Sequence, residues 1–508
     1  MESSVQEGPI GVAAVSEGPS ATARWALWVL QIGAILAVLA AVTDRAFELD
    51  RFFIPKETVL HLTALLAGLL AAGAFQRVRI TIVDALLAAY LLLGVVSTVF
   101  ADDRELALRA LAISASGVAV FWAARALREA GLSRPLIRLL ALAVVLGAVT
   151  SLLQAYGVQS DFFSINRAPG GTLGNRNSIA HLAAFGLPLV LLAALRAGRT
   201  PAYLLGALGV AVVVASLVLT RSRAGWLAFA AVLAVLFAGM LLSRPVRRHP
   251  RVWKRLMVIV LLIGGGVAAA VLVPNSLRWR SENPYLESVT GIANYQEGSG
   301  RGRLVQYGRS LEMAVDRPLL GVGPGNWSEV YPDYAAPGDP SLSRSQPGAT
   351  SNPWPSSDWV AFAAERGFPA ALLLAAALLG IAASALRRLI RARDEDEGIV
   401  ALALLATLAA TLVAGLFDAV LLLAHPTLLV WAGLGALWSP EASRGDGARS
   451  PLRRVLLLVV ALGSGIGFAR SVEQLSTMTI VGLRADATVE SLAGVSRRDD
   501  AESRRAYS

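Results

Sequence analysis

The chain has 508 residues, of which 55% are hydrophobic and only 16% are charged, and its formal net charge is +10 at pH 7. A soluble domain carries about 25% charged residues, so this composition excludes an ordinary soluble protein. The sequence contains no cysteine, which excludes disulfides, thiol catalysis and thiolate metal sites.

Long apolar runs recur along almost the whole chain. Because about 20 apolar residues can cross a bilayer as a helix, the chain is predicted to be an all-α polytopic membrane protein. Twelve transmembrane helices are expected at 25–43, 57–75, 82–100, 105–124, 136–156, 177–195, 202–219, 223–242, 256–273, 358–386, 399–423 and 426–438. A weaker thirteenth segment lies at 455–469.

These helices divide the chain into five regions. Residues 1–24 form a polar N-terminal tail, and its several Glu residues differ from the basic start of a cleaved signal peptide. The remaining regions are helices 1–9 within 25–273, a long polar loop at 274–357, helices 10–12 within 358–438, and a C-terminal region at 439–508.

Arg and Lys gather in alternate short loops, at 77–79, 125–138, 196–199, 244–255 and 387–393. The positive-inside rule assigns these loops and the N-terminal tail to the cytoplasm. The long loop between helices 9 and 10 then faces the periplasm, where its seven Arg and eight acidic residues nearly balance. Because membrane orientation explains the net positive charge, membrane lipids are expected partners and nucleic acid is not.

The segment TRSRAGWL at 220–227 places Arg221 and Arg223 in an outward-facing turn with no acid beside them. One interpretation is that both side chains snorkel to the membrane surface. The other is an anion site, because the next helix begins here with its free N–H groups pointing outward. Arginine beside a helix N-terminus suits phosphate.

Two further outward-facing helix starts show a similar arrangement. Asn175, Arg176 and Asn177 precede the sixth helix, and Ser356 and Asp358 precede the tenth. Asn, Ser and Asp at such positions are more often helix caps than catalytic groups.

The long loop contains Arg301 and Arg303 ahead of a short amphipathic stretch, followed by the turn GVGPGN at 321–326. Gly323, Gly325 and Asn326 in this turn could form a backbone nest for phosphate, or a plain tight turn. Together, the three helix starts and this loop predict an outward-facing, arginine-lined pocket for a phosphorylated lipid or glycan.

Four segments, in this order, resemble the O-antigen ligase and O-antigen polymerase superfamily of bacterial envelope glycosyltransferases. They are GTLGNRNSIAHLAAFGLPL, TRSRAGWLAF, RLVQYGRSLEMAVDRPLLGVGPGNW and SSDWVAFAAERGFPAALLL. The likeness covers roughly residues 50 to 440. It implies about twelve helices with a large periplasmic loop, in the bacterial inner membrane.

The resemblance also implies a reaction. A glycan carried on undecaprenyl pyrophosphate would be joined through its reducing end to a hydroxyl of an acceptor glycan or glycolipid, and lipid pyrophosphate would leave. Arg221 or Arg223, together with Arg301 and Arg303, would hold the pyrophosphate and stabilise its growing charge. No cofactor and no metal is expected, and polysaccharide assembly proteins are candidate partners.

One position departs from the family's pattern. Where ligases have His-Asn, this chain has Ser356 and Ser357, while the later glycine remains as Gly367. A serine cannot activate a hydroxyl at neutral pH without a base, so Asp358 is the candidate base. The difference favours a polymerase-like or exopolysaccharide role, or an inactive member.

Two other polar residues lie near the outer ends of helices 11 and 12. His425 and Asp418 are either functional groups or partners in interhelical hydrogen bonds. Glu365, about two turns into the tenth helix, is less suited to reach the pocket.

Two other classes of function are open at this stage. A transporter or flippase for lipid-linked saccharide would require a polar path through the bilayer midplane, whereas these helices are rich in Leu, Ala and Val. A non-catalytic scaffold for polysaccharide assembly would tolerate substitution of the outward-facing arginines.

Overall fold

A computed structural model describes residues 19–43, 50–74, 80–164, 167–279, 283–291, 296, 298–344, 348–439 and 451–506. Most of the predicted N-terminal tail, the basic loop at 77–79 and residues 440–450 of the predicted C-terminal region lie outside the described residues.

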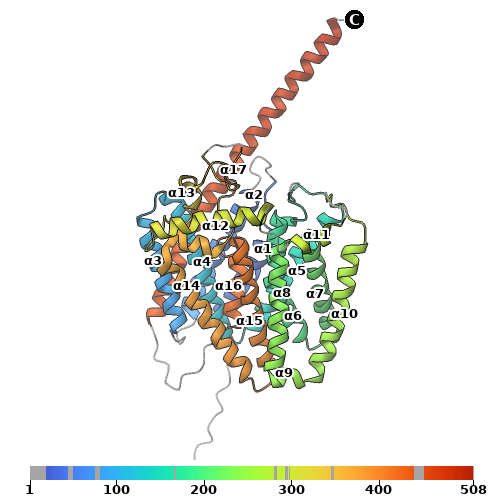
Figure 1. Ribbon diagram of the computed structural model, residues 1–508, viewed down its shortest axis with the longest axis vertical. Coiled ribbons are helices and arrows are strands. Elements are labelled where there is room, and N and C mark those ends of the chain that lie inside the picture. The colour runs from blue at the N-terminus through green and yellow to red at the C-terminus, as the bar shows by residue number, and fades with distance from the viewer. Residues whose placement is uncertain are drawn as a thin grey trace, which may run out of the picture.

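The described chain is a bundle of helices without named strands (Figure 1). Twelve helices are long and apolar enough to cross a membrane, which confirms the all-α polytopic class. Their bounds are α1 Ala21–Leu39, α2 Asp50–Ala74, α3 Ile82–Val99, α4 Arg104–Glu129, α5 Ser133–Ala155, α6 Arg176–Leu195, α7 Thr200–Thr220, α8 Arg223–Leu242, α10 Pro250–Leu272, α14 Asp358–Ile390, α15 Glu395–Phe417 and α17 Pro451–Ala506.

Two helices differ in length from the sequence-based expectation. The predicted twelfth span is the short helix α16 (Ala424–Leu437), whose 14 residues extend about 21 Å at 1.5 Å per residue. That is less than the bilayer's hydrocarbon thickness of about 30 Å. The weaker thirteenth segment instead belongs to α17, whose apolar part covers Arg454–Val481.

The second helix begins earlier than the predicted 57–75, because its charged first turns have partners inside the bundle. Arg51 donates to the carbonyl oxygens of Asp161 at 2.7 Å and Phe163 at 3.1 Å. Lys56 donates to the carbonyl oxygen of Thr172 at 2.8 Å. Carbonyl partners of this kind offset the cost of burying a charge, and hydropathy alone does not register them.

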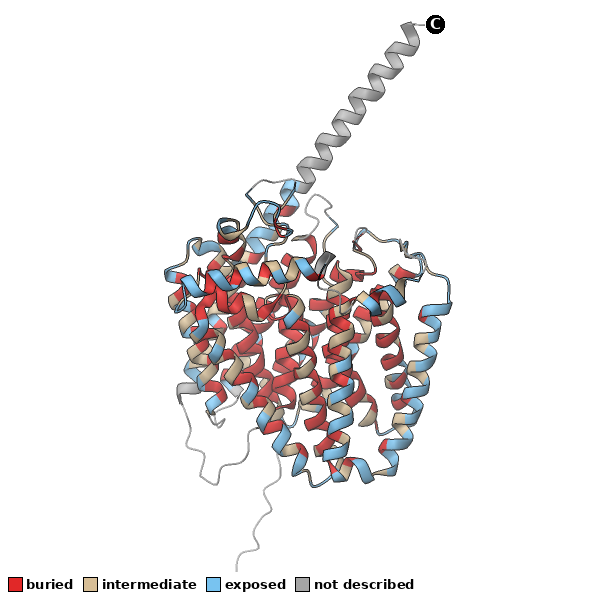
Figure 2. Ribbon diagram, in the orientation of Figure 1, coloured by how far each residue is buried: buried red, intermediate tan, exposed pale blue. Residues whose placement is uncertain are grey.

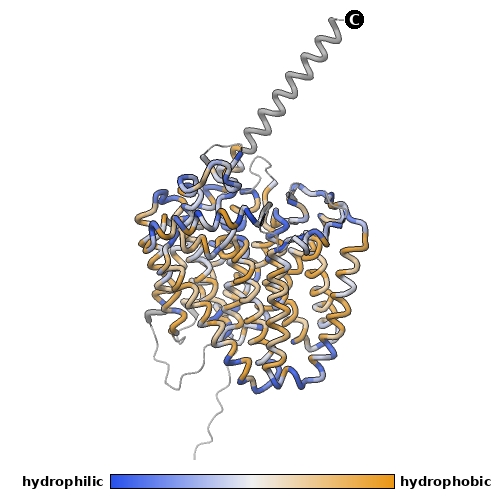
Figure 3. Tube along the Cα trace, in the orientation of Figure 1, coloured by the Kyte–Doolittle hydropathy of each residue, from blue (hydrophilic) through white to orange (hydrophobic). Residues whose placement is uncertain are grey.

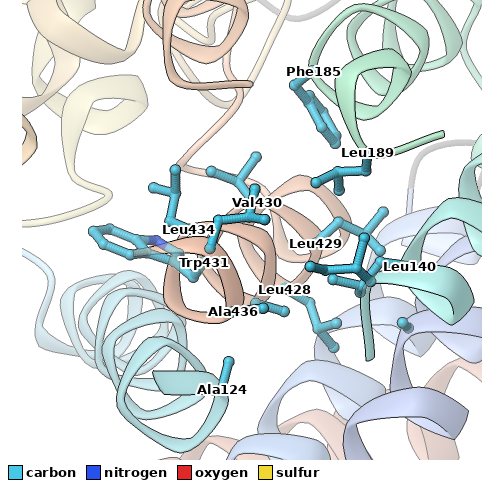
Figure 4. Packing of buried hydrophobic residues seen from close by; sticks show 14 of the residues in the cluster. Ala124, Leu140, Phe185, Leu189, Leu428, Leu429, Val430, Trp431, Leu434 and Ala436 are labelled. Carbon is cyan, nitrogen blue, oxygen red and sulfur yellow. The ribbon is translucent and has the colours of Figure 1, made fainter. Parts of the chain in front are cut away.

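The hydrophobic core surrounds α16, which is buried along its whole length. Figure 4 shows its Leu429, Val430 and Trp431 among side chains such as Leu189 of α6 and Leu140 of α5. In Figure 2 the buried residues lie at the centre of the bundle and the outer helix α10 is largely exposed. The helices are mostly apolar through the middle of the bundle and hydrophilic at both of its ends (Figure 3), as membrane-spanning helices require.

Helices that are not membrane-spanning candidates lie at the two ends of the bundle. The basic helix α9 (Arg244–Arg248) lies at one end, and α11 (Pro284–Thr290), α12 (Gly298–Asp316) and α13 (Trp327–Tyr334) lie at the other (Figure 1). The second end is called the α12 end below. A small core that includes Met313, Val322, Trp327 and Tyr331 packs α12 and α13 against Ala363 and Ala364 of α14.

Helix α14 is kinked where it meets the loop. Gly367 has φ 76° and ψ 165° inside the helix, a conformation that favours glycine. A Cβ at Gly367 would lie 2.4 Å from the backbone carbon and oxygen of Leu319. Across this contact the Phe368 N–H donates to the carbonyl oxygen of Pro318 at 2.9 Å. The loop is therefore fixed to the bundle by backbone contacts that need glycine.

Candidate functional site

A cavity of about 1940 Å³ lies at the α12 end of the bundle. Six parts of the chain supply most of its wall: the connection at 157–168, the start of α6, residues 276–279, α12, the loop segments within 336–356, and residues 418–423. The cavity thus lies between transmembrane helices and the long loop.

The cavity wall carries an excess of positive charge. Among the described lining residues are five arginines and three aspartates: Arg167, Arg176, Arg278, Arg301, Arg303, Asp161, Asp339 and Asp418. A concave surface with one dominant sign of charge concentrates ligands of the opposite sign. The arrangement suits an anionic ligand with several oxygens.

The start of α6 supplies three of the predicted site residues. Asn175 caps the helix by accepting the Asn177 N–H at 3.0 Å, and Asn175, Arg176 and Asn177 all line the cavity. The positive end of the 20-residue helix α6 is therefore directed at the cavity next to a guanidinium.

Asp418 connects α6 to the end of α15. The Asn177 amide donates to Asp418 Oδ2 at 3.2 Å, and the His181 Nε2 lies 3.9 Å from the same oxygen. Asn177 and His181 are four residues apart and share one face of α6. His181 is 3% exposed, and its Nε2 has no hydrogen-bond partner among the described residues. Asp418 is therefore a carboxylate at the end of α15 that residues of α6 contact at the cavity wall.

Helix α12 brings the predicted loop arginines to the same cavity. Arg301, Arg303 and Gln306 all line it, and the Arg303 Nε has no hydrogen-bond partner among the described residues. Gln306 donates to Ser341 Oγ at 3.1 Å and accepts the Ser356 N–H at 2.7 Å. These bonds fix α12 relative to the loop segments on either side.

The two arginines of TRSRAGWL lie behind the cavity wall. Arg221 ends α7 in the left-handed conformation, with φ 52°, and binds Ser288 at 2.9 Å and Glu287 at 3.2 Å on α11. Its guanidinium carbon lies 4.7 Å from the centroid of the Trp279 ring, and that of Arg176 lies 5.5 Å away. Trp279 lines the cavity and Arg221 does not, so Arg221 contacts the described cavity wall through the Trp279 ring.

Arg223 is directed at the same loop helix. A Cβ at Gly291, just after α11, would lie 2.4 Å from a terminal nitrogen of Arg223. Ser222 caps α8 by accepting the Gly225 N–H at 3.4 Å. In the described structure neither Arg221 nor Arg223 belongs to the cavity lining.

Ser356 and Asp358 have different surroundings. Ser356 lines the cavity, and its carbonyl oxygen accepts the Tyr307 hydroxyl at 2.8 Å. Asp358 is 0% exposed, and its carboxylate accepts the backbone N–H groups of Val420, Leu421 and Leu422 at 2.9, 2.9 and 3.4 Å. Asp358 therefore fixes the segment that follows Asp418.

The glycine-rich turn at 321–326 makes its hydrogen bonds and close contacts with other residues of the same chain. The Gly323 N–H donates to the carbonyl oxygen of Glu365 at 2.9 Å. The Asn326 side chain accepts the Asp103 N–H at 2.6 Å and donates to the Asp103 carbonyl oxygen at 2.9 Å. A Cβ at Gly325 would lie 3.0 Å from the Leu106 oxygen. These contacts fasten the turn to α4 and α14, away from the described cavity lining.

His425 is buried at the start of α16, with 1% exposure, and its Nδ1 has no hydrogen-bond partner among the described residues. It lies outside the described cavity lining. Across the described part of the chain, no three His, Asp or Glu side chains group as metal ligands.

Several residues of the cavity had no distinct signal in the sequence. Asp418 was ambiguous between a functional group and a structural hydrogen bond, and Arg278, Trp279 and Trp354 lie in irregular segments whose folding depends on distant contacts. One signal was present: Asn177 and His181 form a polar pair at i and i+4 in a helix that is otherwise largely apolar.

One part of the chain matches a known family. Residues 208–375 match the family model described as O-antigen ligase. No curated protein matches the chain. The match runs from α7 through the long loop into α14, and so includes α12 with Arg301 and Arg303. This match supports placing the chain in the O-antigen ligase and polymerase superfamily, and it suggests a membrane glycan-related ligase or polymerase role.

Proposed function

We propose that the protein is a metal-independent glycosyltransferase of the bacterial inner membrane. It transfers or polymerises a glycan from undecaprenyl pyrophosphate onto an acceptor sugar hydroxyl at the periplasmic face. The observation that carries this proposal is the cavity of about 1940 Å³, whose wall includes arginines from α6 and α12 together with the carboxylate of Asp418.

The arginines hold the donor's pyrophosphate. Arg176 and Arg303 come from different elements, α6 and α12, and both line the cavity. When the bond between the sugar C1 and the pyrophosphate oxygen breaks, negative charge grows on the leaving group. Positive groups already in place stabilise that charge without reorganisation, and one such donor contributes about 3 kcal/mol.

Asp418 acts as the base for the acceptor. As the acceptor oxygen bonds to the sugar C1, its proton passes to the Asp418 carboxylate, and lipid pyrophosphate leaves with the electron pair of the broken bond. Asn177 orients the carboxylate through its 3.2 Å hydrogen bond. Asp358 holds the adjacent backbone instead of taking the proton, because its carboxylate already accepts backbone N–H groups and is fully buried.

The test uses a deletion strain of the producing bacterium and profiles of its lipid-linked and surface glycans. Arg176→Ala/Arg303→Ala should abolish transfer while the protein is made at the wild-type level. Arg309→Ala is the matched control, because Arg309 lies on the same helix α12 but pairs with Glu312 at 2.8 Å, outside the described cavity lining.

The accumulating glycan distinguishes the two reactions. Single repeats left on the lipid carrier indicate a polymerase, and long lipid-linked chains indicate a ligase. Full complementation by the double variant would contradict the proposal and favour a scaffold or a transporter of lipid-linked saccharide.

A further inference from the structure

We propose that Trp354 is the floor of a binding site for one pyranose ring of the acceptor glycan. The inference rests on the proposed function and specifies where the second substrate binds. Trp354 lines the cavity together with Ser356 and Asp418, and its ring is only partly buried. It differs from Trp279, the other tryptophan of the described wall, whose ring is already in contact with the guanidiniums of Arg176 and Arg221.

The segment around Trp354 is rigid. Its sequence is Asn352-Pro353-Trp354-Pro355, so two residues have the fixed φ of proline and the two that precede them are restricted to extended conformations. The next residue, Ser356, is bound to α12 through Gln306 at 2.7 Å and Tyr307 at 2.8 Å. A ring that is already fixed loses little entropy when a ligand stacks on it.

The Trp354 ring packs against apolar side chains of the protein. Phe53 of α2 meets Trp354 edge to face, with centroids 5.0 Å apart and an interplanar angle of 79°. Phe53, Ala419 and Leu423 form a small apolar cluster on which Trp354 packs. Edge-to-face support of this kind stabilises one orientation of the ring. Because Ala419 follows Asp418, a sugar on Trp354 would lie beside the proposed base.

The chemistry of the surrounding wall favours a sugar over the isoprenoid chain of the donor. Ser351, Asn352 and Ser356 line the cavity near Trp354 in the chain and carry hydroxyl and amide groups. A sugar ring offers C–H groups to the aromatic face and hydroxyls to these polar groups. An isoprenoid would cover the same polar groups without offering them hydrogen bonds, which is unfavourable.

The test measures binding to purified full-length protein in detergent by saturation-transfer NMR. The probes are methyl glycosides of glucose, galactose, mannose, rhamnose and N-acetylglucosamine, with inorganic pyrophosphate and farnesyl pyrophosphate as separate ligands. We expect at least one glycoside to receive saturation at its ring C–H protons. Trp354→Ala should weaken its binding at least tenfold, whereas Trp354→Phe should largely retain it.

Trp253→Ala is the matched control, because Trp253 is a partly exposed tryptophan in α10 whose Nε1 donates to the Arg247 carbonyl oxygen of α9, at the opposite end of the bundle. Pyrophosphate binding should be unchanged in Trp354→Ala and lost in Arg303→Ala.

The inference is overturned if no glycoside binds wild-type protein, or if Trp354→Ala leaves glycoside binding intact. It is also overturned if that variant weakens farnesyl pyrophosphate instead, since Trp354 would then contact the lipid. Glycoside binding at Trp354 in a protein without transferase activity would contradict the proposed function alone.

Discussion

The Asn177 amide donates to the Asp418 carboxylate at 3.2 Å, and this bond joins the N-terminus of α6 to the C-terminal end of α15. A cationic helix start and a carboxylate thereby lie in one cavity. Such a pair suits a reaction in which an anion leaves while a hydroxyl loses its proton.

Asp418→Asn should lower the turnover number by about 100-fold or more, the usual contribution of a general base, while donor affinity changes little. The measurement is glycan transfer by purified protein at saturating donor. Asp161→Asn is the control, because Asp161 is another aspartate of the cavity wall. A turnover number within a few-fold of wild type would remove Asp418 from the mechanism.

Asp358→Asn should destabilise the protein as well as inactivate it. The amide can accept fewer of the three backbone N–H groups that the carboxylate now accepts, and each buried donor left without a partner costs about 1–3 kcal/mol. Thermal unfolding in detergent checks this expectation. Equal stability of wild type and Asp358→Asn, with activity lost, would instead favour Asp358 as the base.

Arg221→Ala should have a smaller effect than Arg303→Ala, because Arg221 contacts the cavity only through Trp279. Loss of the Arg221–Glu287 pair, in which Glu287 is largely exposed, should cost about 0.2–1 kcal/mol of stability, with only a small decrease in activity. Glu287→Gln should reproduce this decrease. If Arg221→Ala abolishes transfer and Glu287→Gln does not, Arg221 binds the pyrophosphate directly.

Gly367→Ala should lower the thermal stability and release the long loop from α14. The left-handed conformation alone costs a residue with a Cβ about 1–3 kcal/mol, and the Cβ would meet the Leu319 backbone at 2.4 Å. Protease sensitivity within 318–368 is the measurement. Gly264→Ala in α10, where a Cβ meets nothing within 4 Å, should be neutral or slightly stabilising.

Tyr331→Phe should alter the response to alkaline pH. Burial raises the pKa of Tyr331, and its hydroxyl donates to Asp339 at 2.9 Å. The folded state therefore favours the neutral phenol, so this stability is present below the unfolded pKa of about 10 and decreases as pH rises above it. Protease resistance of the loop should fall more between pH 8 and pH 11 in wild type than in Tyr331→Phe. Equal losses would contradict the assignment.

The sequence predicted the fold well because apolar length alone identifies most spans. It misplaced the start of α2, where Arg51 and Lys56 are buried against carbonyl oxygens that come from distant segments. It also predicted that the start of α6 and the arginines of α12 would share an outward-facing pocket, and the structure brings them into one cavity.

Other parts of the site could not be predicted, because they depend on contacts between segments far apart in the chain. Arg221 and Arg303 have the same charge and both lie close to a helix start in the sequence, yet only Arg303 lines the described cavity. Likewise, Asp358 is a candidate base by its place in the sequence, and its hydrogen bonds to the backbone N–H groups of residues 420–422 exist only in the folded chain.

Helix α17 packs on α2 and α4 through close glycine contacts. A Cβ at Gly68 would lie 2.8 Å from the Ala461 Cβ, and one at Gly467 would lie 2.8 Å from the His61 ring. The packing of α2 and α4 is therefore completed by a helix that is made much later. During biosynthesis α2 and α4 enter the membrane with one side covered only by lipid, until the ribosome has translated beyond Gly467. Assembly of this bundle is consequently a late event, and a chain that ends before α17 would leave the membrane insertion machinery with an unfinished core.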